Sequence, residues 1–303
     1  MGTPEFAANI LEGLLAENYN IVTVVSQPDK EVGRKRILTP SPTKEVALRH
    51  NIPVIQPIRI RTDYESVLSY EPDLIITAAY GQIIPEILLN YPKYGCINAH
   101  GSLLPKYRGG APIQWSIING DKVTGMTIMR MSKGMDEGDI FLKEELLIEI
   151  DDTNSTVFRK LSDLALEMLV RFIPDYISGN YVVIKQDDAL ASYAYNLKKE
   201  DEFISFNRDT MTVYNHIRGL LDNPGAYGIL KDRKYKFIRV SFELCDNSQA
   251  SMFKGLENDY LRIDCSDGFI KVYEIKPEGK NNMDAKSFFN GAGRGLVGEY
   301  FNG

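Results

Sequence analysis

Short runs of β-branched residues alternate with helix-forming segments over the first 120 residues, and this alternation restricts the fold more than any other feature. Runs suited to buried strands lie at 20–27, 73–80 and 96–100. Between the first two, Ser41 and Pro42 have the residue types that favour a helix N-cap and a first helical position. The alternation predicts a Rossmann-like, doubly wound and mostly parallel α/β sheet, whose ligands lie at the carboxyl ends of the strands.

Longer periodic segments extend this prediction. The segment 153–179 has apolar residues at helical spacing and predicts a long amphipathic helix. Shorter helices are expected at 62–70, where Thr62 is a candidate N-cap, and at 111–120. The alternation at 124–132 predicts a further strand.

The pattern changes after about residue 204. One helix is expected at 210–220, and short β-type runs separated by turns follow within 226–277. A small β-barrel or sandwich accounts for such runs. We therefore expect a first domain over 1–188, a linker over 189–203 and a second domain over 204–303.

Composition excludes several classes of protein. No apolar run reaches the roughly 18 residues needed to span a bilayer. The cysteines are widely spaced, which argues against zinc sites and disulfides and favours a reducing cytoplasm. The net charge of −6 argues against a nucleic-acid partner, yet basic clusters stand at 30–36 and 231–239, and phosphate binding depends on local clusters.

One strand end combines groups suited to catalysis. Asn98 and His100 are two residues apart in an extended segment, so both side chains can face one cleft. An amide can donate to an oxyanion and an imidazole titrates near neutral pH, which suits acyl or formyl transfer to an amine. Asp136, between Gly134 and Gly138, could orient the imidazole, and the glycines would let the backbone approach a ligand. A satisfied structural histidine and a turn-capping asparagine remain the alternative.

Two longer segments extend these observations. Residues 97–115 and 125–140 resemble the signatures of 10-formyltetrahydrofolate-dependent formyltransferases. The resemblance implies that Asn98, His100 and Asp136 are catalytic, that 10-formyltetrahydrofolate is the formyl donor, and that no metal is needed. It also implies a folate site on two segments, made of Ser102, Leu103, Leu104, Pro105, Tyr80, Gly81 and Ile83.

Other segments narrow the resemblance to family members that formylate an aminoacylated tRNA. They are 2–7, 27–34, 39–47, 223–230 and 275–291. These members combine a Rossmann-like catalytic domain with a C-terminal OB-type β-barrel domain. The implied partner is initiator methionyl-tRNA, bound by a monomeric, cytoplasmic enzyme without a membrane contact.

The basic cluster at 30–36 acquires a role from this resemblance. It corresponds to an inserted loop that contacts the tRNA acceptor end, so Arg34, Lys35 and Arg36 are the expected tRNA-binding residues. Two alternatives stay open at this point. One is an enzyme that formylates the amine of a nucleotide-linked sugar, and the other is a non-catalytic folate- or tRNA-binding protein.

The family places a hydrophobic strand directly before the segment that matches residues 2–7. Here Met1 immediately precedes that segment, so the first strand is expected to be missing from the centre of the sheet. Its absence would expose backbone groups and core surface on the neighbouring strands. A form with this start is expected to be less stable and less active than one with the strand.

Overall fold

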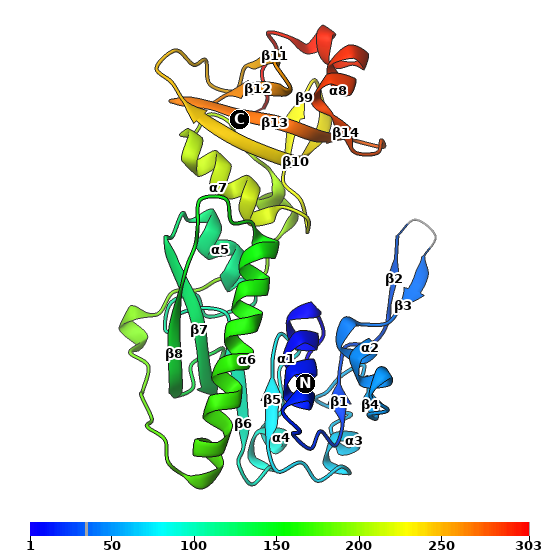
Figure 1. Ribbon diagram of the computed structural model, residues 1–303, viewed down its shortest axis with the longest axis vertical. Coiled ribbons are helices and arrows are strands. Elements are labelled where there is room, and N and C mark those ends of the chain that lie inside the picture. Colours follow the sequence, from blue (N-terminus) through cyan, green and yellow to red (C-terminus); the bar gives the residue numbers. More distant parts are fainter. Residues whose placement is uncertain (34–35, 303) are drawn as a thin grey trace. The chain divides into compact units, whose positions relative to one another are not determined.

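The computed structural model describes residues 1–33 and 36–302, and its chain divides into two units (Figure 1). The N-terminal unit consists of Met1–Pro112, Val123–Leu147 and Phe158–Tyr195. The C-terminal unit consists of Ile113–Lys122, Ile148–Val157 and Asn196–Gly303. No helix in the described ranges is both long enough and apolar enough to cross a membrane.

The N-terminal unit contains a four-stranded ladder. Its order is β5 (Ile75–Thr77), β6 (Cys96–His100), β7 (Val123–Arg130) and β8 (Ile140–Leu147). Strands β5 and β6 are parallel, whereas β7 pairs antiparallel with both β6 and β8. The predicted α/β class is confirmed, and the antiparallel strands are an addition to the mostly parallel sheet. Strand β8 runs antiparallel to β7 because residues 131–139 join them by a loop too short for a parallel crossover.

Two helices of this unit test the N-caps expected from the sequence. Ser41 caps α2 (Pro42–Arg49) by accepting a hydrogen bond from the Lys44 amide at 3.2 Å, as its position before Pro42 predicts. The predicted cap at Thr62 is wrong, because α3 (Glu65–Leu68) begins later and the Thr62 hydroxyl donates to the Arg59 carbonyl.

The remaining helices of the unit are α1 (Glu5–Ala16), α4 (Glu86–Asn90) and most of α6 (Asn154–Ser178). The long helix predicted at 153–179 is therefore confirmed. Strands β2 (Lys30–Val32) and β3 (Ile37–Thr39) form an exposed antiparallel pair, called the hairpin below, which Figure 1 shows at one side of the unit. The hairpin was not predicted from the sequence.

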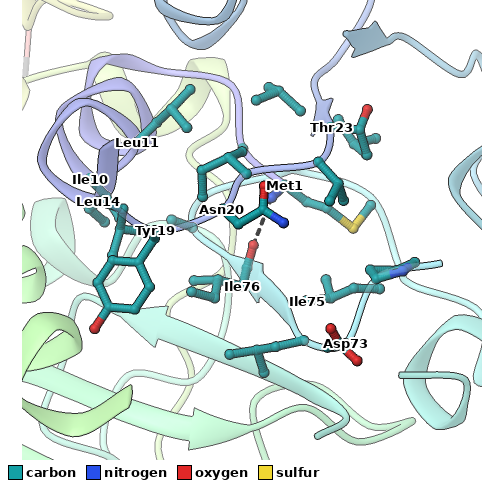
Figure 2. Close-up of a pocket in the computed structure, with 18 of the residues that line it drawn as sticks. Met1, Ile10, Leu11, Leu14, Tyr19, Asn20, Thr23, Asp73, Ile75 and Ile76 are labelled. Atoms are coloured by element: carbon teal, nitrogen blue, oxygen red, sulfur yellow. Dashed lines mark hydrogen bonds between the residues drawn. The ribbon is translucent and has the colours of Figure 1, made fainter. Parts of the chain in front are cut away.

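The sheet is interrupted beside β5. Strand β1 (Val24–Val25) pairs in parallel with β4 (Val54–Ile55) but belongs to a separate ladder. Met1 and Gly2 bridge part of the gap, since the Met1 amino group donates to the Ile76 carbonyl at 2.7 Å and the Gly2 amide to the Val25 carbonyl at 2.9 Å. The rest of the gap is a cavity of about 280 Å³, called the slot below (Figure 2).

The C-terminal unit is built on a second sheet. The strand order is β11 (Phe253–Glu257), β12 (Tyr260–Asp264), β13 (Gly268–Pro277), β10 (Arg233–Leu244) and β9 (Tyr227–Leu230), with β14 (Met283–Asp284) on β13. All these pairings are antiparallel, in keeping with the OB-type fold.

The helices of the C-terminal unit include α7 (Thr210–Leu220), α8 (Ala285–Gly291) and all but the first residue of α5 (Pro112–Ile118). The predictions of helices at 111–120 and 210–220 are confirmed, and α8 was not predicted. Of two short 3₁₀ turns, Lys199–Glu202 lies within the segment expected to be a linker and Asp188–Leu190 begins one residue before it. The proposed domain limits at 188 and 204 stay a prediction.

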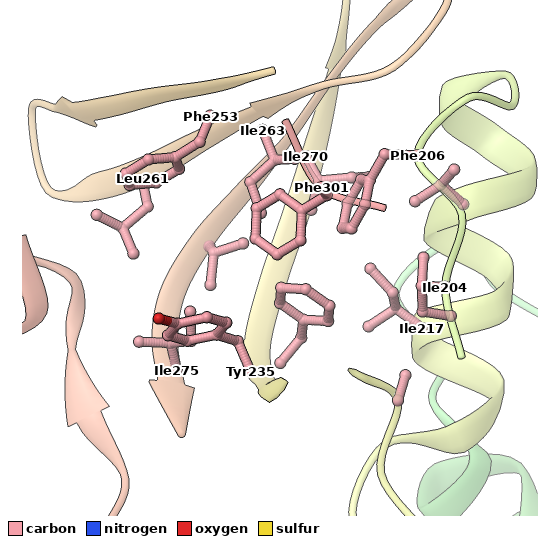
Figure 3. Packing of buried hydrophobic residues seen from close by; sticks show 14 of the residues in the cluster. Ile204, Phe206, Ile217, Tyr235, Phe253, Leu261, Ile263, Ile270, Ile275 and Phe301 are labelled. Atoms are coloured by element: carbon pink, nitrogen blue, oxygen red, sulfur yellow. The ribbon is translucent and has the colours of Figure 1, made fainter. Parts of the chain in front are cut away.

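An aromatic core fills the C-terminal unit (Figure 3). Phe206 is completely buried, and its ring centroid lies 5.5 Å from that of Phe237 and 5.0 Å from that of Phe301. These rings come from the segment before α7, from β10 and from the C-terminal end of the chain. The core therefore ties the two ends of this unit to the middle of its sheet.

Phe206→Ala should destabilise the C-terminal unit by about 3–5 kcal/mol, because it removes a large buried ring and leaves a cavity. Urea unfolding followed by the fluorescence of Trp115, the single tryptophan, measures this because Trp115 belongs to the same unit. Leu244→Ala is the control, since Leu244 is 58% exposed and should cost less than about 0.5 kcal/mol. Equal losses for both variants would contradict the packing described here.

Burial in the slot lowers the pKa of the Met1 amino group from 8.0 to about 6. The folded form then holds this proton more weakly than the unfolded chain does. The contribution of Met1 to stability is therefore complete above pH 8 and is lost as the pH falls through about 6. A ¹⁵N NMR titration of the amino group should give a pKa near 6 in the folded protein, and a value near 8 would show that the group is solvated.

Candidate active site

Asn98 and His100 lie at the carboxyl end of β6, which is paired on both sides. Asn98 is opposite Thr77 of β5, and His100 is opposite Thr127 of β7. The Thr77 hydroxyl donates to Asn98 Oδ1 at 2.8 Å, so the amide oxygen is turned toward β5. Asn98 Nδ2 donates to no residue in the described part of the chain and remains a donor for a ligand.

The His100 ring is held between two segments. Its Nε2 lies 2.9 Å from the Tyr107 carbonyl, and because a carbonyl can only accept, Nε2 carries a hydrogen. Its Nδ1 lies 3.6 Å from Asp136 Oδ2, beyond an ordinary hydrogen bond but within ion-pair range. The ring is 6% exposed, so its orientation is fixed by these partners.

Asp136 lies in the loop between β7 and β8 and adopts a left-handed φ of 49°. Its Oδ2 accepts a hydrogen bond from the Gly109 amide at 2.9 Å, and its side chain is 19% exposed. The structure therefore brings Asp136 to His100, while Asn98 lies two residues before His100 on the same strand. Gly138 was expected to let the backbone approach a ligand, but close packing within the protein also requires a glycine there. A Cβ at this position would lie 1.9 Å from the Arg130 carbonyl of β7.

A clasp formed by Gln186 and Arg108 supports this loop, and the sequence analysis missed both residues. Gln186 Nε2 donates to the main-chain carbonyls of Asp136 and Gly138 at 2.8 and 2.7 Å. Its Oε1 accepts from Arg108 Nε and Nη2 at 3.1 and 2.9 Å. Arg108 is only 3% exposed and also pairs with Asp188 at 2.7 Å. A buried cation paired in this way fixes the segment that presents the Gly109 amide.

The predicted folate segment 102–105 lies against β7 and β8. The Ser102 hydroxyl donates to the Lys106 carbonyl at 2.6 Å, and both Ser102 and Leu104 are fully buried. Lys143 Nζ donates to the Leu104 carbonyl at 3.2 Å. Leu103 and Pro105 are half-buried, so their side chains are the ones that can face a ligand.

The predicted segment 80–83 follows β5, beside the end of β6. Tyr80 is 4% exposed, burial raises the pKa of its hydroxyl to about 12, and that hydroxyl has no hydrogen-bond partner in the described part of the chain. The Tyr80 carbonyl accepts from Gln27 Nε2 at 3.0 Å. Gly81, with a φ of 85°, and Ile83, which is 67% exposed, are at the surface.

Of the predicted tRNA-binding residues, Arg34 and Lys35 lie outside the described residues. Arg36 adjoins β3 in the hairpin, with a side chain that is 81% exposed. Its Nε lies 3.8 Å from Glu31 Oε2, a surface pair that water and salt screen. Over residues 1–33 and 36–302, no group of histidine, cysteine and acidic side chains is arranged to hold a metal ion.

Gln186→Glu should loosen the Asp136 loop without changing the size of the side chain at position 186. The new carboxylate still accepts from Arg108 but can no longer donate to the two carbonyls. We expect exchange of the Gly109 amide to become roughly 10- to 30-fold faster, which corresponds to about two lost hydrogen bonds. Lys185→Glu, at the exposed neighbouring position, is the control, and unchanged exchange in Gln186→Glu would show that the clasp does not hold the loop.

Two family models match this chain. The model described as "Formyl transferase" matches residues 1–173, and the model described as "Formyl transferase, C-terminal domain" matches residues 196–293. Similar curated proteins are named methionyl-tRNA formyltransferase. The one from Staphylococcus epidermidis is 43% identical over 99% of this chain and 97% of the relative, and that from Halalkalibacterium halodurans is 44% identical over 100% and 97%.

Solved structures share the fold. The sugar 3N-formyl transferase WlaRD has a TM-score of 0.66 at 22% identity, over 92% of this chain and 97% of that one. Methionyl-tRNA formyltransferase from Clostridium thermocellum has a TM-score of 0.57 at 24% identity, over 80% and 91%. The family matches and the near full-length identity together show that this chain belongs to the formyl transferase family.

Proposed function

We propose that the protein transfers the formyl group of 10-formyltetrahydrofolate to the α-amino group of methionyl initiator tRNA. The observation that carries this proposal is the identity of 43–44% to methionyl-tRNA formyltransferases, which extends along both units. Such a reaction supplies formylmethionyl-tRNA for translation initiation. We place the protein in the cytoplasm as a monomer, which matches its expected tRNA partner.

The reaction forms one bond and breaks another. The α-amino nitrogen attacks the formyl carbon, the bond from that carbon to the donor N10 breaks, and the amine proton ends on the departing N10. A tetrahedral oxyanion forms between these steps. We assign Asn98 Nδ2 to hold this oxyanion, because Thr77 fixes the amide oxygen and leaves the N–H groups free for the substrate.

His100 and Asp136 act as a pair in this proposal. Because His100 Nε2 is bound to the Tyr107 carbonyl, Nδ1 is the nitrogen that faces Asp136 and the developing charge. A protonated ring is stabilised by the carboxylate and adds positive charge beside the oxyanion. Asp136 orients the ring and accepts the amine proton through water before that proton passes to the departing N10, while the Gly109 amide keeps the carboxylate in place.

We assign the two substrates to separate surfaces. The donor folate contacts the half-buried Leu103 and Pro105 and the segment 80–83, all at the carboxyl edge of the sheet. The acceptor end of the tRNA contacts the exposed strands β2 and β3 and the basic residues that lie between them in the sequence, Arg34, Lys35 and Arg36. Backbone phosphates explain the clustered positive charge.

A second candidate acceptor is the amino group of a nucleotide-linked sugar. The fold similarity to WlaRD favours it, with a TM-score of 0.66. The proposal of a tRNA acceptor is better supported, because the sequence identity of 43% over 99% of the chain exceeds the 22% found for WlaRD. A binding protein without turnover is the third possibility, and the variants below separate it from an enzyme.

Asn98→Ala should lower kcat for formyl transfer about 10²–10³-fold, because it removes one oxyanion donor. Single-turnover formation of formylmethionyl-tRNA measures the chemical step directly. Asn180→Ala, at an exposed position, is the control, and circular dichroism checks that both variants fold. Near wild-type turnover in Asn98→Ala would remove this residue from the mechanism.

Asp136→Asn should lower kcat about 10²-fold or more and change its dependence on pH, because the amide can accept from Gly109 but cannot pair with a charged His100. His100→Ala should cause a comparable loss, and the double variant should lose little more, since the two residues act as a unit. Asp139→Asn, at a half-buried position in the same loop, should leave kcat unchanged. Additive losses in the double variant would contradict the pairing.

A further inference from the structure

Two tyrosine rings are stacked on the surface of the N-terminal unit. The ring centroids of Tyr193 and Tyr195 lie 5.6 Å apart, and the two ring planes differ by only 5°. Tyr193 is 52% exposed and Tyr195 is 60% exposed. Because the rings cover each other on one side, their exposed surface belongs to the outer faces and the edges. This pair is called the tyrosine platform below.

The backbone around Ala194 sets the direction of the two rings. The Ala194 amide donates to the Arg108 carbonyl at 2.7 Å, and the Ala194 carbonyl accepts from the Ala111 amide at 3.0 Å. Ala194 is completely buried. In an extended segment the residues on either side of a given residue point to the opposite face, so Tyr193 and Tyr195 point outward together.

The platform differs from a tyrosine that is exposed alone. Single exposed aromatic residues are common on protein surfaces and need no function. Here the hydrogen bonds of Ala194 fix the backbone between the two rings, and the rings restrict each other. A planar ligand can therefore stack on the pair with little further loss of side-chain freedom.

The platform lies beside a segment that contacts both proposed catalytic side chains. The segment 107–109 contacts His100 through its first carbonyl and Asp136 through its last amide. Tyr193 forms a parallel bridge with the middle residue of this segment, Arg108, which places the two backbones about 5 Å apart. The platform is thus one strand spacing from the segment that supports the candidate active site.

A lysine stands at the edge of the same surface. The Ser192 amide donates to the Pro105 carbonyl at 3.3 Å, and the Ser192 carbonyl accepts from the Arg108 amide at 2.8 Å. Lys106 lies between these two contacts and is exposed. Aromatic rings next to a cation suit single-stranded nucleic acid, because the rings stack on bases and the cation attracts the backbone phosphates.

We propose that the tyrosine platform binds the 3′-terminal nucleobase of the acceptor tRNA by stacking, with Lys106 beside the adjoining phosphate. This inference rests on the proposed function. In methionyl-tRNA the amino acid is esterified to the terminal ribose, so that ribose and its base directly follow the methionine whose amine reacts. An amine placed at His100 and Asp136 therefore brings the terminal base to the neighbouring surface. Stacking tolerates any base, so the platform positions the acceptor without reading its sequence.

The test compares two double variants of the full chain, Tyr193→Ala with Tyr195→Ala and Tyr193→Phe with Tyr195→Phe. Loss of both rings should lower kcat/KM for methionyl-tRNA roughly 10- to 100-fold, the range expected for one lost base–ring stack. The phenylalanine variant keeps both rings and should stay within about twofold of the wild type. Tyr91→Ala is the control, because Tyr91 is 45% exposed and lies at the C-terminal end of α4, and circular dichroism checks that all variants fold.

A second acceptor identifies the group that the platform binds. Methionyl-tRNA with an abasic terminal nucleotide should lose the same factor with wild-type protein, and should lose little more with the alanine variant, because both changes remove one contact. Additive losses, equal losses in the alanine and phenylalanine variants, or an unchanged kcat/KM in the alanine variant would each overturn the inference while leaving the proposed function intact. Absence of transfer to methionyl-tRNA by the wild type would overturn the proposed function and this inference together.

Discussion

The hydrogen bond from the Gly109 amide to the Asp136 carboxylate is the contact on which the candidate site depends. It joins the segment after β6 to the loop between β7 and β8, and the same carboxylate oxygen faces His100 Nδ1 at 3.6 Å. Without it, Asp136 would sit in an exposed loop in a left-handed conformation with no fixed direction. The bond converts two loops into one surface and so places a negative charge beside a histidine that is almost fully buried.

Support for this contact comes from polar groups that are themselves buried. Arg108 is 3% exposed, and its guanidinium binds Gln186, which in turn binds the carbonyls of Asp136 and Gly138. No fully buried side-chain nitrogen or oxygen of Arg108, Gln186 or Asp136 lacks a partner in the described part of the protein. This is the condition under which a buried polar network adds rigidity instead of cost. Catalysis by preorganised groups requires such rigidity, because an oxyanion donor that must first reorient contributes less to the rate.

Local signals predicted most elements and part of the site. The short strand-like run at 96–100 and the capped segments at 42–49 and 210–220 fold as their sequences indicate. The helices depend on local hydrogen bonds, and the strand is buried on both faces. In contrast, the chain direction in β7 and β8, the pairing of β2 with β3 and the contacts of Gln186 depend on tertiary contacts. A lone glutamine in an extended connector has no periodicity, so no pattern could have indicated that it reaches two carbonyls about 50 residues away.

The central claim is that this site formylates an aminoacylated tRNA, and the most direct measurement is a comparison of acceptors. Purified protein with 10-formyltetrahydrofolate would be offered methionyl initiator tRNA, the same tRNA without methionine, and an amine on a nucleotide-linked sugar. The account predicts formyl transfer to methionyl-tRNA alone, with kcat/KM at least 10³-fold above that for the sugar. Transfer to the sugar in preference to methionyl-tRNA, or folate binding with no transfer to any acceptor, would contradict it.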